Sequence, residues 1–153
     1  MTIEPTYRER LGVPLRWWVQ GTMLIATLWL ALVVAVPGPV AWGVTSALLA
    51  LLALLLTAYG SPRIVVVDGV LHVGRARIAA EHLGSAVALD AEQTRRKAGV
   101  EADARAYLVL RPYLARAVVI EINDRADPAP YWLVCTRHPE ALASAIGSLT
   151  RTG

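Results

Sequence analysis

The densest group of side chains that could do chemistry is the basic run Arg95, Arg96 and Lys97. Near an anionic bilayer each such cation contributes about 1 kcal/mol of attraction. Anionic lipid head groups are therefore candidate ligands of this run, although a solvated loop without a ligand is the favoured interpretation. Trp132 and Arg137 complete the set of candidate lipid or partner contacts, because Tyr131 and Trp132 follow Pro130 and one of the two should face outward in a strand.

The patterns that would indicate catalysis or metal binding are weak. Cys135 and His138 are spaced as C-x-x-H, but a zinc site needs three or four ligands, so we predict no metal and no cofactor. Asp124 and Asp127 lie in a stretch rich in Asp and Pro, which is typical of turns. We predict no catalytic residue. The alternative is an enzyme that acts on a membrane-proximal substrate through Asp90, Arg95, Tyr131 and Arg137.

Two long apolar segments dominate the chain that must position these residues. Residues 17–62 contain no Asp, Glu, Lys or Arg, and the whole chain is 56% hydrophobic and 18% charged. Soluble domains are about 45–50% apolar and about 25% charged. Pro37-Gly38-Pro39 divides this block into segments 17–36 and 40–59, each about 30 Å long as a helix, which matches the bilayer core. We predict a transmembrane helical hairpin, 17–59, with its turn at 37–39.

Arginine residues predict the direction of the hairpin. Arg8, Arg10 and Arg16 precede it, three more follow it at positions 63, 75 and 77, and the connection at 37–39 has none. The positive-inside rule then places both termini in the cytoplasm, with residues 1–16 as a cytoplasmic N-terminal segment. Ala31 and Ala35, and Gly43 and Ala47, repeat small residues at four-residue spacing, which favours close packing of the two helices.

The region 61–153 has the pattern of a small strand-rich domain. Alternating or β-branched apolar runs, separated by turns such as Asp68-Gly69, predict seven strands. Apolar residues at helical spacing after Pro139 predict a C-terminal helix over 139–150. The stretch 90–106 is polar and aperiodic and is predicted to be a loop with one helical turn. The predicted strands are 64–67, 70–73, 76–78, 85–89, 107–110, 116–122 and 131–136.

Seven strands and a terminal helix describe a partly open barrel of the pleckstrin-homology (PH)-like kind, although other small β folds share this tally. The segment 64–78, with its turns at Asp68-Gly69 and Gly74-Arg75, resembles the opening of bacterial PH-like domains. The segment 7–11 (Tyr-Arg-Glu-Arg-Leu) and the tail 127–140, with Pro130-Tyr131-Trp132 and Thr136-Arg137-His138, resemble an actinobacterial family of small membrane proteins of unknown function. The resemblance implies an α+β membrane protein: a two-helix transmembrane hairpin followed by a PH-like domain.

These features together predict a membrane-anchored, non-enzymatic binding or scaffold protein at the inner face of the plasma membrane. The predicted partners are membrane lipids and either a protein or a second copy of the chain. An accessory subunit of a larger membrane complex is the alternative. The net charge of +3 is too small to indicate nucleic-acid binding.

Overall fold

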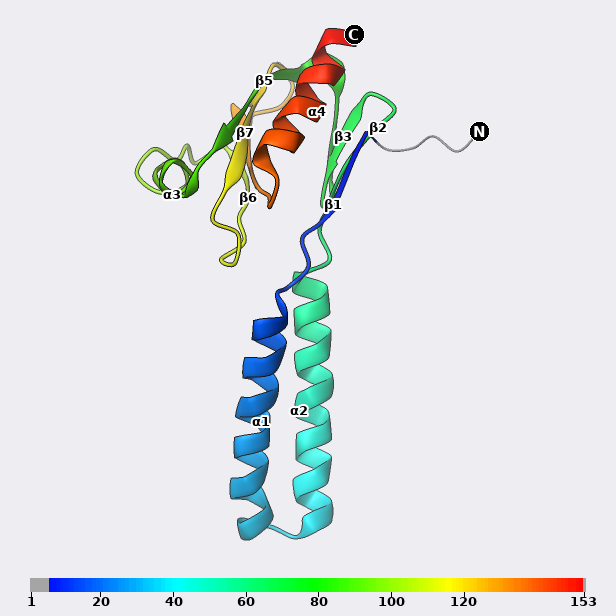
Figure 1. Ribbon diagram of the computed structural model, residues 1–153, viewed down its shortest axis with the longest axis vertical. Coiled ribbons are helices and arrows are strands. Elements are labelled where there is room, and N and C mark those ends of the chain that lie inside the picture. The colour runs from blue at the N-terminus through cyan, green and yellow to red at the C-terminus, as the bar shows by residue number, and fades with distance from the viewer. Residues whose placement is uncertain (1–5, 153) are drawn as a thin grey trace. The chain divides into compact units, whose positions relative to one another are not determined.

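The computed structural model describes residues 6–152 and separates into two units (Figure 1). The helical unit is Gly12–Ser61. The strand-rich unit is formed by the chain on both sides of it, up to Leu11 and from Pro62 onward. Each unit is described by itself.

The helical unit consists of α1 (Leu15–Ala35) and α2 (Gly38–Tyr59), which run antiparallel (Figure 1). Both helices are long and apolar enough to cross a membrane. The predicted turn 37–39 is narrower in the structure, because α2 begins at Gly38 with Pro37 as its N-cap. Pro39 therefore lies in the first helical turn, where proline is tolerated since its missing N–H has no helical partner.

The contact between α1 and α2 does not use the small residues that the spacing suggested. A Cβ placed on Gly43 would have no neighbour within 4 Å, whereas one on Gly21 would lie 2.9 Å from both methyl carbons of Leu52. Ala41 and Thr45 are the buried residues of α2. The prediction for Gly43 is therefore wrong, and Gly21 is the glycine that permits the close approach.

The first sheet of the strand-rich unit is a four-stranded antiparallel meander. Its strands are β1 (Tyr7–Arg10), β2 (Arg63–Val67), β3 (Val70–Val73) and β4 (Ala76–Ala79). The β2–β3 turn has positive φ at both Asp68 (51°) and Gly69 (70°), as two-residue hairpins prefer. Strand β1 was not predicted, and its residues were assigned to a separate N-terminal segment, of which residues 1–5 lie outside the described part.

Strand β1 pairs with β2 although the whole helical unit lies between them in the sequence. The register places Tyr7 opposite Val66 and Arg10 opposite Arg63. The chain therefore leaves the sheet after β1, forms the helical unit, and returns to the neighbouring strand β2 of the same sheet. The helical unit is an insertion into a β hairpin.

The second sheet contains β5 (Leu83–Leu89), β7 (Ala117–Ile122), β8 (Tyr131–Cys135) and β6 (Tyr107–Val109), in that order. Pairs β5–β7 and β7–β8 are antiparallel, and β6 runs parallel to β8. All seven predicted strands are present. Together with β1 they form two open four-stranded sheets, however, and a short 3-10 turn, Ala80–His82, separates β4 from β5.

Two helices complete the unit. The C-terminal helix α4 (Pro139–Thr152) packs against β5 and β7 and buries Leu142 and Ile146 completely. Figure 1 shows it beside these strands. Helix α3 (Ala91–Ala98) lies within the stretch 90–106 that was predicted as a loop with one turn. A single hydrophobic core joins both sheets and α4, with Ile64, Ile120 and Leu133 at its centre.

Candidate functional site

A surface pocket of about 380 Å³ lies where α3 meets the second sheet; we call it the α3 pocket. Val87 and Val119 are register partners on β5 and β7, and with Leu89 they line it as apolar residues. The polar lining residues are Gln93, Arg96, Lys97 and Glu101. Its volume lies within the range of about 300–1,000 Å³ that is typical of small-molecule sites.

Helix α3 is held in place by its cap and by its last turn. The Asp90 carboxylate accepts a hydrogen bond from the Gln93 backbone N–H at 2.8 Å, and the Gln93 side chain accepts one from the Asp90 N–H at 3.0 Å. This reciprocal capping box stabilises a helix start. At the other end, the Lys97 ammonium lies 4.5 Å from the centre of the Tyr131 ring, and the Arg96 guanidinium lies 3.2 Å from a Glu101 carboxylate oxygen.

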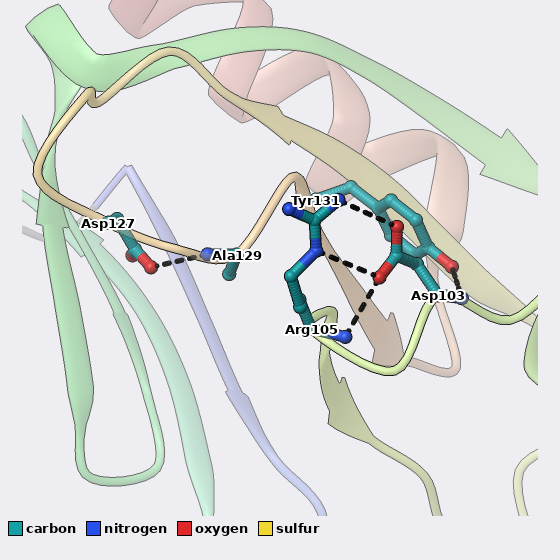
Figure 2. Close-up of polar contacts among 5 residues, drawn as sticks. All are labelled: Asp103, Arg105, Asp127, Ala129 and Tyr131. Atoms are coloured by element: carbon teal, nitrogen blue, oxygen red, sulfur yellow. Dashed lines mark hydrogen bonds and ion pairs between the residues drawn. The ribbon is translucent and has the colours of Figure 1, made fainter.

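The chain after α3 is also bound to Tyr131 (Figure 2). The Asp103 backbone N–H donates a hydrogen bond to the Tyr131 hydroxyl at 3.0 Å. The Asp103 carboxylate accepts from the Arg105 N–H at 2.9 Å, and this bond together with the Arg105 side chain lowers the pKa of Asp103. Tyr131 contacts both α3 and the segment that follows it. This tyrosine therefore holds α3 and residues 98–106 against the second sheet.

A second polar cluster, which we call the Glu9 clasp, joins β1 to the end of β8. Glu9 is only 8% exposed. Its carboxylate accepts hydrogen bonds from the Tyr7 hydroxyl at 2.7 Å, from the Arg137 backbone N–H at 2.9 Å and from the Thr136 hydroxyl. Since buried carboxylates need such partners, the clasp ties together two segments separated by more than a hundred residues.

The surroundings of the clasp extend this connection. Burial, together with the neighbouring Glu9 carboxylate, raises the pKa of Tyr7 to about 12, although the Thr136 hydrogen bond opposes the shift. The Arg137 guanidinium donates to the Arg10 carbonyl at 3.0 Å, and the Tyr113 hydroxyl donates to the Leu11 carbonyl at 2.8 Å. These bonds hold the backbone of the segment that leads into the helical unit.

The structure separates the predicted contact residues. Arg96 and Lys97 line the α3 pocket, whereas Arg95 is exposed on the same helix and is not among the lining residues. Arg137 belongs to the Glu9 clasp, where its backbone N–H donates to the Glu9 carboxylate and its guanidinium donates to the Arg10 carbonyl. The basic run is therefore divided into two pocket residues and one solvated residue.

The prediction that either Tyr131 or Trp132 faces outward is wrong. Tyr131 is 9% exposed and Trp132 is 4% exposed, and the Trp132 ring lies 5.0 Å from that of Tyr107. All five residues of β8 are buried: β7 and β6 flank the strand, its residues belong to the hydrophobic core, and Lys97 of α3 lies over the Tyr131 ring. Trp132 is thus a core residue, inaccessible to a partner on this surface.

The four residues of the enzyme alternative do not form one site. Asp90 caps the start of α3, and Tyr131 lies under its last residues. Arg137 lies beyond the opposite end of β8 and is bound to β1.

The acidic pair Asp124 and Asp127 are turn residues, as predicted. Each carboxylate accepts a hydrogen bond at 2.8 Å from the backbone N–H two residues ahead, and Figure 2 shows the bond from Ala129 to Asp127.

Cys135 is 2% exposed, and burial raises the pKa of its thiol. His138, its partner in the C-x-x-H spacing, is exposed. The buried cysteine and the exposed histidine do not make a common surface.

Several residues of these clusters were missed at the level of sequence. The spacing Asp90-x-x-Gln93 is the pattern of a capping box and could have indicated α3. Val87 and Val119 carried no signal, because their pairing depends on the order of strands in the sheet. Glu9 and Thr136 were quoted only as parts of two recognisable segments, and their contact depends on the tertiary fold.

The two segments that carried the sequence resemblance meet in the Glu9 clasp. A family model described as "Protein of unknown function (DUF3093)" matches residues 6–146, which includes both segments. No curated protein and no solved structure gives a significant match. The prediction of an uncharacterised family is confirmed, while its actinobacterial origin stays a prediction. The chain belongs to the DUF3093 family.

Proposed function

We propose that this protein is a membrane-anchored binding protein whose helical unit forms a transmembrane hairpin and whose strand-rich unit presents a binding surface at the inner membrane face. One observation carries the proposal. Two helices of 21 and 22 residues expose almost all of their apolar side chains, with Leu24 at 72%, Val34 at 87% and Leu54 at 65% exposure. Exposed apolar area on this scale is stable in lipid and unstable in water.

The insertion of the hairpin into the β1–β2 connection supports its topology. Because β1 and β2 pair in one sheet, the chain before α1 and the chain after α2 must lie on the same side of the bilayer. The arginines that flank the hairpin, such as Arg16 and Arg63, favour the cytoplasmic side. The strand-rich unit and both termini are then cytoplasmic, and residues 37–39 lie at the outer surface.

We also infer that the strand-rich unit is a variant of the PH-like fold. If β6 is left aside, four antiparallel strands are followed by three more and by a C-terminal helix, with the transmembrane hairpin inserted between the first two strands. The parallel β6 and the separation of the two sheets are departures from a single barrel. An experimental structure that showed another strand order would contradict this inference.

Cysteine accessibility tests the anchoring and the topology. In a Cys135→Ala background, Gly38→Cys places a thiol at the exposed first residue of α2, next to the connection with α1, and Arg75→Cys places one in the exposed β3–β4 turn. We expect a membrane-impermeant maleimide to label Gly38→Cys in intact cells and Arg75→Cys only after permeabilisation. The protein should also resist alkaline extraction from membranes. Release by alkali, or labelling of both positions from outside, would contradict the proposal.

The binding role is tested by purification of the full chain in mild detergent after crosslinking in cells. A binding or scaffold protein should retain a lipid, a second copy or a partner at substoichiometric levels. Retention of one partner at fixed stoichiometry through every step would instead identify an accessory subunit of a larger complex.

A further inference from the structure

The floor of the α3 pocket is apolar although it faces outward. Val87 is 51% exposed, and Val119 and Leu89 are partly exposed beside it. Val87 and its register partner Val119 lie on the face of the sheet opposite to the buried Val118 and Ile120. Val119 and Leu89 also pack against the edge of the core, whereas Val87 is the exposed part of the floor. An apolar floor within a concave site is favourable for a ligand that has an apolar part, because binding removes that surface from water.

The rim of the pocket carries two cations and one carboxylate. Lys97 is held over the Tyr131 ring, so its ammonium is positioned by a contact that leaves it charged. Arg96 is paired with Glu101, but both side chains are about half exposed or more, at 64% and 49%. Exposed ion pairs are held weakly, so an incoming anion can share or replace Glu101 at the guanidinium.

The Gln93 amide adds a neutral donor beside these cations. Its side-chain oxygen is occupied by the Asp90 N–H, which leaves the amide NH₂ free of that bond. The rim therefore offers an ammonium, a guanidinium and an amide around a floor of valine and leucine. This combination matches neither a bare inorganic ion nor a purely apolar molecule.

We propose that the α3 pocket binds a small amphipathic anion, in which one phosphate or carboxylate head group is joined to a short apolar part. Arg96 and Lys97 bind the head group, and Val87 and Val119 contact the apolar part. This inference rests on the proposed role as a membrane-anchored binding protein and names the ligand chemistry of that role. Such an anion could be the head-group region of a bilayer lipid or a free amphiphile.

The test uses the full chain in phosphatidylcholine nanodiscs with methyl-labelled valine. Val87 and Val119 report from the pocket, and the fully buried Val66 reports on the fold. Hexyl phosphate below its micellar concentration should shift the two pocket methyls with an affinity about tenfold higher than hexanol or inorganic phosphate, because only hexyl phosphate contacts both floor and rim. A second series with anionic lipid in the nanodisc and no added ligand distinguishes a bilayer lipid from a free amphiphile. Shifts of the Val87 and Val119 methyls in that series indicate a bilayer lipid. Shifts only on addition of hexyl phosphate indicate a free amphiphile.

Matched variants separate the pocket from general charge. Arg96→Gln, Lys97→Gln and Val87→Gln should each weaken hexyl phosphate binding by about tenfold, whereas Arg95→Gln, from the same basic run, should leave it unchanged. Unchanged Val66 shifts would show that the fold is intact. Equal affinity for hexanol, or an equal effect of Arg95→Gln, would overturn the inference. If the anchoring fails, the chain is released by alkali and is not recovered with the nanodiscs; if only the pocket fails, the chain is recovered with them but its Val87 and Val119 methyls do not shift.

Discussion

Replacement of Glu9 by alanine is the sharpest test of how the strand-rich unit is held together. The change removes the acceptor of the buried Thr136 hydroxyl and of the part-buried Arg137 N–H. The Tyr7 hydroxyl, 3.2 Å away, is then the remaining side-chain acceptor within reach of the Thr136 hydroxyl. An unsatisfied buried donor costs about 1–3 kcal/mol, so the cost is about 1 kcal/mol if the Thr136 hydroxyl pairs with Tyr7 instead and up to about 6 kcal/mol if both donors stay unsatisfied. The Tyr7 hydroxyl is left out of this sum because it is half-buried and can turn toward water.

The thiol of Cys135 provides the assay. It is 2% exposed, is the only cysteine of the chain and is adjacent to Thr136. Its reaction with a disulfide reagent therefore requires β8 to open, and the rate follows the opening equilibrium when reclosing is fast. Since about 1.4 kcal/mol corresponds to a factor of ten, Glu9→Ala should accelerate labelling by about 5- to 20,000-fold.

Two comparisons decide whether this reasoning holds. Arg8→Ala removes an exposed side chain from the same strand and should change the rate by about twofold or less. Thr136→Ser keeps the hydroxyl and should open far less than Thr136→Val. The reasoning is refuted if Glu9→Ala labels within about threefold of the native rate, which is below the cost of one lost buried hydrogen bond, or if Arg8→Ala has an equal effect.

Three further outcomes follow from other contacts. Tyr7→Phe should remove an ionisation near pH 12 from an absorbance titration. Because the folded-state pKa of Tyr7 is raised, the contribution of Tyr7 to the free energy of unfolding should be present below about pH 10 and lost as the pH rises through about 12. Gly69→Ala should lower the free energy of unfolding of the strand-rich unit by about 1–2 kcal/mol, because φ is +70° there, whereas Asp68→Asn should have little effect; thermal unfolding of both variants measures this. Gly21→Leu should lower the yield of a disulfide crosslink engineered between α1 and α2, because even a Cβ at this position would lie 2.9 Å from Leu52. Gly43→Leu should leave that yield unchanged, because a Cβ there has no neighbour within 4 Å.

Local patterns were enough to predict most elements of the fold. The β-branched runs and their turns located β2 to β5 and β7, because alternation and positive-φ turn residues are properties of adjacent residues. The apolar segments on either side of Pro37 predicted α1 and α2 for the same reason. Strand β1 escaped prediction because Tyr7–Arg10 is short and polar, and its partner β2 is found only after the whole helical unit.

The candidate sites were less accessible to this reasoning. Arg96 and Lys97 were identified from charge alone, but their separation from Arg95 depends on which side of α3 meets the sheet. Trp132 was assigned to the surface because alternation assumes one open face, and β8 has both faces covered. Glu9 appeared only as part of the segment 7–11.

The sequence by itself determined the two apolar helices, the strand-rich remainder and the arginines that flank the hairpin, since each follows from composition or from the period of a single segment. Tertiary structure alone decided that Glu9 meets Thr136 and Arg137, and that Val87 and Val119 form a pocket floor beside Lys97. Those contacts join residues far apart in the chain, and they exist only because strand order and the position of α3 bring the segments together. The physical reason is that periodicity specifies which face of an element is apolar, whereas the packing of all elements specifies what that face touches.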